Sequence, residues 1–133
     1  MVCRACQKHD LAVLACVDES GVPPGERGHD IVYSRTVIQS CPECRASEVE
    51  VYDHDCFDHE DVFDQYRWYV LEKSAAEQLR GLLQACPAPL SAGCGCAVHD
   101  ALRTSCRALP SPGNPGIHPA RLDVADGLPR IRA

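Results

Sequence analysis

The sequence is poor in the residues that build large cores and membrane spans. Only 5% of its 133 residues are aromatic, among them one Trp and two Phe, although 45% are hydrophobic. Such a chain can bury a modest core, of the size found in one small domain. No apolar run approaches the ~20 residues of a transmembrane helix, and the first residues lack the basic-then-apolar order of a secretory signal. These absences exclude a membrane span and predict a protein of the cytoplasm.

Basic residues are also scarce. Lys and Arg total 13 against 19 Asp and Glu, which gives a net charge of −6. Proteins that bind nucleic acid usually present a basic face, because phosphate contacts supply most of their affinity, so nucleic-acid binding is disfavoured. Residues 46–66 contain no Lys or Arg and are either a solvated acidic face or a docking surface for a basic partner. Their carboxylates are those of Glu48, Glu50, Asp53, Asp55, Asp58, Glu60, Asp61 and Asp64.

Cysteine is the residue in excess, with ten in the chain. An even number fits either the disulfides of an exported protein or thiolates that hold metal in a reducing compartment. The expected cytoplasmic location and the recurrence of closely spaced pairs favour metal. Nearly all basic residues are Arg and Ala is abundant, a composition that suggests a GC-rich bacterial source.

Hydrophobic patterning predicts a small α+β domain over residues 1–107. Ser74 and Glu77 have the spacing of a capping box, and an apolar stripe then continues to Pro87, which predicts a helix. A second short helix is expected over residues 97–105. Stretches rich in apolar, β-branched or alternating residues predict a small antiparallel sheet, with strands over residues 11–17, 29–39, 48–53 and 66–71.

The end of the sequence has a different composition. Residues 108–133 hold half of the ten prolines and a third of the nine glycines. We expect an irregular tail there, either disordered or laid across the domain in extended form.

Two Cys-x-x-Cys pairs, Cys3–Cys6 and Cys41–Cys44, indicate a metal site. Two residues between paired cysteines let one tight turn direct both sulfurs at a single ion. Zinc in structural sites is commonly held by four thiolates in a tetrahedron. Because the second pair lies between two predicted strands, at the tip of a hairpin, we expect one zinc ion bound by all four cysteines.

On these two pairs, residues 1–55 resemble the zinc-ribbon fold group. The resemblance implies a small sheet beside one zinc ion and names a fold, not a function. Two features depart from the pattern. Residues 7–40 separate the pairs, more than the usual ~15–20, so an extra strand must be accommodated. Arg45 stands where ribbons often place Gly.

A redox interpretation competes at the second pair. Cys41 and Cys44 have the spacing of a dithiol oxidoreductase, in which a following helix lowers the pKa of the first cysteine. Here residues 48–51 have a strand pattern instead, and acidic surroundings are expected to raise the pKa of a thiol. The sequence therefore favours metal binding over redox catalysis.

A second metal site is predicted from Cys86, Cys94, Cys96 and His99, which makes two zinc ions in all. Cys96 and His99 lie three residues apart and share one face of the second predicted helix. The fourth ligand could instead be Cys106 or Cys56. In the alternative without metal, Cys86 is a core residue in phase with the apolar stripe of the first helix, and His99 lies at the surface.

The other cysteines and histidines carry weaker signals. Cys16 lies in an apolar strand and is expected to be a buried small hydrophobe. Cys56 is flanked by possible ligands of a hydrolytic metal centre (His54, His59 and Glu60), but no known catalytic motif organises them. Ordinary surface positions are expected for His9, His29 and His118.

These observations favour a non-enzymatic protein, an adaptor or an immunity-type inhibitor that binds a basic protein partner. Residues 48–64 would supply the charge, with Tyr66, Trp68 and Tyr69 as anchors. The first alternative is a zinc-ribbon protein that binds nucleic acid or has a regulatory role. A metal hydrolase or thiol oxidoreductase is the second.

Overall fold

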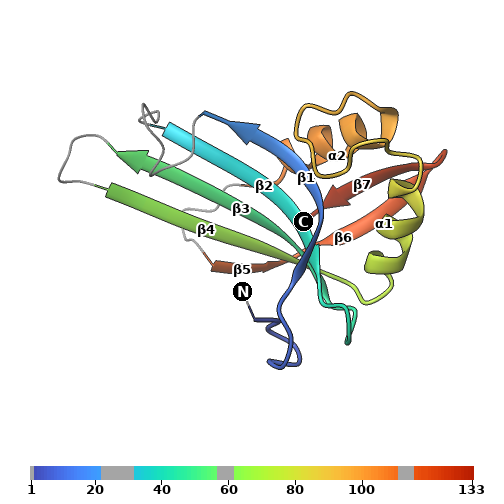
Figure 1. Ribbon diagram of the computed structural model, residues 1–133, viewed down its shortest axis with the longest axis horizontal. Helices are drawn as coiled ribbons and strands as arrows, with labels where there is room; N and C mark the ends of the chain where they lie inside the picture. Colours follow the sequence, from blue (N-terminus) through green and yellow to red (C-terminus); the bar gives the residue numbers. More distant parts are fainter. Residues whose placement is uncertain (1, 22–31, 57–61, 111–115) are drawn as a thin grey trace.

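The structure, a computed structural model, describes residues 2–21, 32–56, 62–110 and 116–133 (Figure 1). This part of the chain has the α+β fold that the sequence predicts, with seven strands and two helices. In chain order the elements are β1 (Ala12–Ser20), β2 (Val32–Ser40), β3 (Ser47–Cys56), β4 (Val62–Leu71), α1 (Ala75–Leu83), α2 (Ala97–Arg107), β5 (Gly116–Pro119), β6 (Arg121–Ala125) and β7 (Leu128–Arg132).

Five strands form the main sheet, in the order β1-β2-β3-β4-β5. Strands β1 to β4 pair as antiparallel neighbours in chain order, and β5 adds to β4 in parallel. β2 and β3 pair in one register, from Val32 opposite Asp55 to Ser40 opposite Ser47. Residues 41–46 therefore form the turn of this hairpin, which places the second Cys-x-x-Cys pair where the sequence predicts.

One face of the sheet and both helices enclose the core. Along β3, Val49 and Val51 are buried in it, whereas Glu48 and Glu50 point to the opposite face, as strand alternation requires. Both helices and the hairpin β6–β7 gather at one end of the main sheet (Figure 1). The larger core side chains are those of Val17, Ile38, Val49, Tyr69, Leu71, Leu79, Leu83, Leu102, Leu122 and Ile131.

The two predicted helices are present, but the predicted capping box is wrong. Ser74 has helical backbone angles, φ −73° and ψ −16°, and its side chain makes no capping hydrogen bond. A cap needs an extended residue that can direct its oxygen at the free amides of the first turn. Glu77 instead pairs with Arg45. In the described part of the chain, neither helix has both the length and the apolar character to cross a membrane.

The sequence predicts a tail over residues 108–133 that is either disordered or laid across the domain in extended form, and the described residues 116–132 are extended but form regular strands. Residues 116–132 form β5, β6 and β7, and Leu122 and Ile131 are buried in the main core. Asp126 and Gly127, with φ of 55° and 74°, make the turn between β6 and β7. Asp-Gly between strands is a strong hairpin signal, because both residues tolerate positive φ. This segment is therefore an integral part of the fold.

Candidate metal centres

The structure brings all eight predicted ligand residues together in two groups. The first group is Cys3, Cys6, Cys41 and Cys44, and the second is Cys86, Cys94, Cys96 and His99. Within each group the ligand atoms all lie within 4.8 Å of one another. Each group could therefore hold a metal ion.

The first group is built from two turns of the same kind. The amide of Gln7 donates to the Cys3 carbonyl at 2.9 Å, and the amide of Arg45 donates to the Cys41 carbonyl at 3.1 Å. Gln7 and Arg45 have φ of 57° and 63°, so each turn closes with a left-handed residue. Arg45 thus adopts the conformation for which ribbons often use Gly, at a cost of about 1–2 kcal/mol.

The sulfur distances of the first group match a four-thiolate site. Cys3 Sγ lies 3.5 Å from Cys44 Sγ, and Cys6 Sγ lies 3.8 Å from Cys41 Sγ. Zinc–sulfur bonds of about 2.3 Å place tetrahedral sulfurs about 3.8 Å apart. The two turns lie next to each other at the bottom of Figure 1, below the end of the main sheet. The two halves of the site are therefore already positioned around a common centre.

Backbone amides favour the thiolate form in this group. The amide of Cys44 donates to the Cys41 sulfur and lowers the pKa of that thiol to about 6. The amide of Cys6 lowers the pKa of Cys3 in the same way. For Cys3 and Cys41 this differs from the expectation that acidic surroundings raise the pKa, because the amide donors are the largest cause of both shifts. The Ala46 amide lowers the pKa of Cys44, but burial and the neighbouring thiols together outweigh it and raise that pKa to about 11. Cys41 is fully buried, although Cys44 is exposed, and the pair is followed by β3, not by a helix, so its first cysteine does not have the setting of a redox nucleophile.

The second group is centred on a fully buried histidine. His99 Nε2 lies 2.8 Å from the carbonyl oxygen of Cys16. A carbonyl can only accept, so Nε2 carries a proton, and in the neutral ring Nδ1 is then the nitrogen with the free lone pair. His99 Nδ1 faces the cluster, 3.6 Å from Cys86 Sγ, which in turn lies 3.6 Å from Cys94 Sγ. A metal-binding histidine usually donates its other ring N–H to a carbonyl or carboxylate in this way, which orients the ring toward the ion.

The start of α2 supplies the other half of the second group. Cys96 is the N-cap residue of α2, and its sulfur accepts the amide hydrogen of His99 at 3.4 Å. The amide of Cys96 lowers the pKa of Cys94, whereas burial raises the pKa of Cys86 to about 11. A bound cation would favour ionisation of Cys86, because a metal ion deprotonates a coordinating thiol.

Arg103 and the edge of β1 hold the loop that carries Cys94. Arg103 Nη2 donates to the carbonyls of Ala92 and Cys94, at 2.7 and 2.9 Å. The amide of Cys16 on β1 donates to the Pro89 carbonyl at 2.9 Å. The loop is thus fixed to α2 on one side and to the sheet on the other. Sequence spacing finds the four ligands, but these supports join residues that lie far apart in the chain.

The remaining cysteines lie outside both groups as far as the structure describes them. Cys16 is buried, as predicted, and Cys106 is buried in the core, so it does not replace His99. Nothing is described of the Cys56 side chain, and His29, His59 and Glu60 lie outside the described residues.

The other described histidines lie outside both groups. His54 is buried and its Nδ1 lies 2.6 Å from Asp64 Oδ1, within the segment that suggested a hydrolytic centre. His9 is exposed, as expected, whereas His118 is half-buried against the ring of Tyr69. No third group of metal-binding side chains is found among the described residues.

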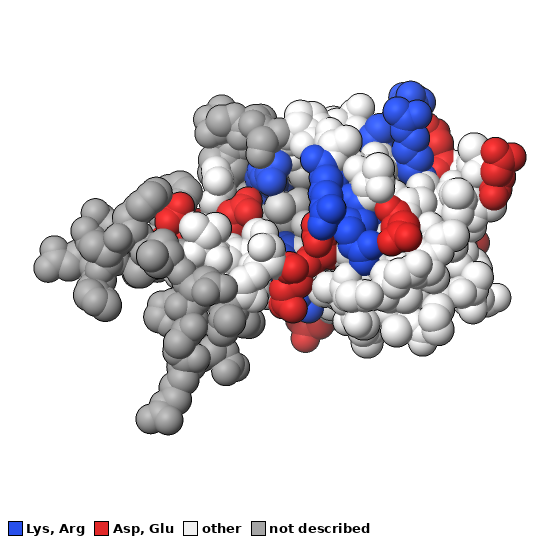
Figure 2. Space-filling model, turned by 90° about the horizontal axis from the view of Figure 1, so that it is seen from above, with Lys and Arg blue, Asp and Glu red and all other residues white. Residues whose placement is uncertain are grey.

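The acidic segment is less exposed than its composition suggests. Glu48 is buried and pairs with Arg4, 3.2 Å away, and Glu50 accepts a hydrogen bond from Trp68 Nε1 at 2.9 Å. Tyr69, expected as an anchor, is 1% exposed in the core, because it lies on the face of β4 opposite Trp68. On the face seen in Figure 2, basic and acidic side chains lie beside one another.

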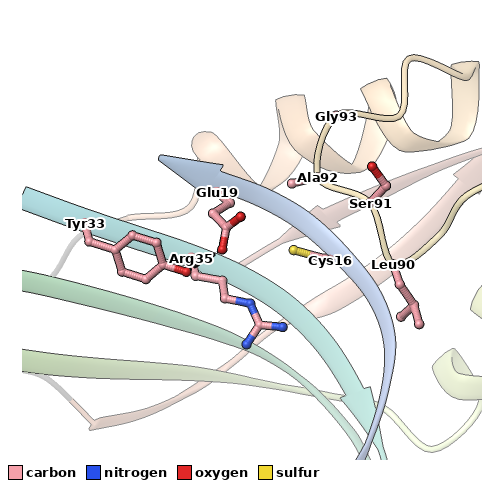
Figure 3. A pocket seen from close by; sticks show the side chains of 8 residues that line it. All are labelled: Cys16, Glu19, Tyr33, Arg35, Leu90, Ser91, Ala92 and Gly93. Carbon is pink, nitrogen blue, oxygen red and sulfur yellow. Dashed lines mark hydrogen bonds between the residues drawn. The ribbon is translucent and has the colours of Figure 1, made fainter. Parts of the chain in front are cut away.

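A pocket of about 560 Å³ lies beside the second group, between β1, β2 and the loop that leads to Cys94 (Figure 3). The Tyr33 hydroxyl donates to Glu19 across it at 2.5 Å. Burial, together with this carboxylate, raises the pKa of Tyr33 to about 12. Its lining residues include Cys16 but none of the second group's four ligands, so the pocket adds no ligand to that group.

No family model, curated protein or solved structure matches the chain. Each group offers four thiol or imidazole side chains, the number of ligands in a tetrahedral structural metal site.

Proposed function

We propose that the protein is a non-enzymatic zinc-binding protein in which two ions fix the fold. The fixed tautomer of His99 is the observation that carries this proposal, because it reserves Nδ1 for a ligand inside a set of three thiols. The two matching turns of the first group support a zinc-ribbon assignment for residues 1–55. Sulfur and imidazole ligands in a four-coordinate set are those that zinc prefers.

Native mass spectrometry with metal analysis, on protein purified without oxygen, tests this proposal. We expect two zinc ions per chain in the wild type. Cys41→Ser and Cys94→Ser should each lose one ion, because each removes one ligand from a different group. Cys106→Ala is the matched control and should retain both ions, since Cys106 belongs to neither group. A metal-free protein, or thiols joined as disulfides, would refute the proposal.

We further propose that the protein acts by binding a basic protein partner through its aromatic face. We use this name for the side of β3, β4 and β5 that carries Tyr52, Tyr66, Trp68, Val70 and Ile117. Tyr66, Val70 and Ile117 are 38%, 38% and 59% exposed. Exposed apolar side chains that adjoin one another often mark an interaction site.

Strand pairing places negative charge beside these rings. Trp68 lies opposite Glu50 on β3 and opposite Ile117 on β5, so the three side chains form one row across the sheet. Asp64 lies at the other end of the face, where it accepts a hydrogen bond from the Tyr52 hydroxyl at 2.6 Å. Rings bordered by carboxylates suit a partner that presents basic side chains.

Association with octa-arginine tests the charge of this face. Glu50→Gln should slow association about two- to fivefold at low ionic strength, because a rim charge acts mainly on the encounter rate. Stopped-flow fluorescence of the single Trp measures that rate. Asp123→Asn on β6, where Asp123 pairs with Arg132, is the matched control and should leave the rate unchanged. Equal rates for Glu50→Gln and the wild type would contradict this part of the proposal.

A further inference from the structure

We propose that Trp68 and Glu48 form a binding site for a guanidinium group, that Arg4 occupies this site within the chain, and that metal in the first group keeps it there. The inference rests on the proposed function, because it names the side chain by which a basic partner would be recognised: arginine. Release of the first metal ion would open the site.

The contacts of Arg4 define the site. Its guanidinium carbon lies 4.0 Å from the centroid of the Trp68 ring. Its Nε and Nη2 donate to the two carboxylate oxygens of Glu48, at 3.2 and 3.4 Å. A flat ring face combined with a two-oxygen acceptor matches the planar fork of a guanidinium, whereas an ammonium group fits only one of these features.

The acceptor side of the site is rigid and prearranged. The Glu48 side chain is 6% exposed, and Gln39 Nε2 donates to it at 3.0 Å from β2. Gln39 also donates to Glu50 at 3.3 Å, and Glu50 accepts from Trp68 Nε1. The ring of Tyr66 stacks on Trp68 with an interplanar angle of 8°. The sheet would therefore keep this arrangement if Arg4 departed.

The donor side depends on the first metal group. Arg4 lies between Cys3 and Cys6, in a segment that the first group brings next to the β2–β3 turn and that Arg4 joins to Glu48 on β3. The described backbone bonds of residues 2–10 are local, such as Cys3 to His9 and the bridge between Val2 and Asp10. Loss of the ion would remove the link between this segment and the β2–β3 turn, and with it the constraint that directs Arg4 toward the sheet.

An emptied site would attract another guanidinium. Removal of Arg4 leaves the buried Glu48 carboxylate without its cation, which is strongly unfavourable. The hydrogen bond from Gln39 does not supply the missing charge. A partner arginine would restore both the ion pair and the ring contact, and the other side chains of the aromatic face would lie beside it.

Small-molecule binding to Arg4→Ala tests the site directly. Trp68 is the only Trp in the chain, so its fluorescence reports the stacking. We expect methylguanidinium to bind the zinc-loaded Arg4→Ala variant saturably, at least tenfold more tightly than methylammonium. The zinc-loaded wild type should bind it at least tenfold more weakly than the variant. Adding Glu48→Gln to Arg4→Ala should abolish the preference for methylguanidinium.

The double variant Cys41→Ser/Cys44→Ser tests the coupling to metal. With Arg4 present but the first group empty, it should bind methylguanidinium as Arg4→Ala does, while metal analysis shows the second ion retained as a check on folding. No preference for methylguanidinium in Arg4→Ala would overturn the site, and a double variant that behaves as wild type would overturn the metal coupling. The proposed function is tested separately, by octa-arginine association with the wild type. A negative result for the guanidinium site or for its coupling to metal therefore does not decide the proposed function.

Discussion

Removal of metal from the reduced protein is expected to abolish its cooperative thermal unfolding and most of its circular dichroism signal. Structural zinc binding contributes roughly 10–16 kcal/mol in small domains, as much as the whole ~5–15 kcal/mol of a typical folding free energy. The core here contains few aromatic residues, and the second group joins β1, α1 and α2 at its edge.

A chelator added under reducing conditions, with the same chelator presaturated with zinc as the control, measures this dependence. The two groups should contribute unequally. Cys44→Ser should release mainly residues 2–10, whereas Cys94→Ser should also detach the loop between the helices from β1, and should lower the midpoint more. Full circular dichroism and an unchanged midpoint after complete removal of metal would show that the ions are not structural.

Local sequence signals predict much of both metal centres. A Cys-x-x-Cys turn is defined within a few residues, so its geometry does not depend on distant contacts. The meander from β1 to β4 follows from alternation and from hairpin turns, which are local too. Alternation along β4 also separates Tyr69 from Trp68, and the Asp126-Gly127 turn marks the hairpin β6–β7, so these features were open to prediction.

The supports of the two sites could not be predicted in the same way. Glu48 and Arg4 are 44 residues apart, and His99 and Cys16 are 83 residues apart. Such pairs depend on how the elements pack, and no spacing rule links them. The sequence therefore indicates an acidic surface, whereas in the structure Glu48 is buried and paired with Arg4. Likewise, the capping-box pattern at Ser74 does not form a cap, because Ser74 has helical backbone angles, and Glu77 pairs instead with Arg45 from the β2–β3 turn.

Replacement of His99 should separate its two roles, as a ligand and as a link to β1. His99→Ala removes both Nδ1 and the hydrogen bond to the Cys16 carbonyl, and it leaves that buried carbonyl without its donor. We expect loss of one zinc ion and destabilisation by at least about 3 kcal/mol, since a ligand, a buried hydrogen bond and side-chain volume are lost together.

His99→Cys is the matched variant, because it offers a fourth thiolate from the same position on α2 but cannot reach β1. It should retain two zinc ions by native mass spectrometry and should recover part of the stability that His99→Ala loses. The shortfall that remains measures the link to Cys16, expected at about 1–3 kcal/mol for an unsatisfied buried carbonyl and the packing around it. If His99→Ala kept both ions, Nδ1 would not be a ligand. A buried histidine held by one carbonyl would then be a packing residue only, and the second group would be a cluster of three thiols.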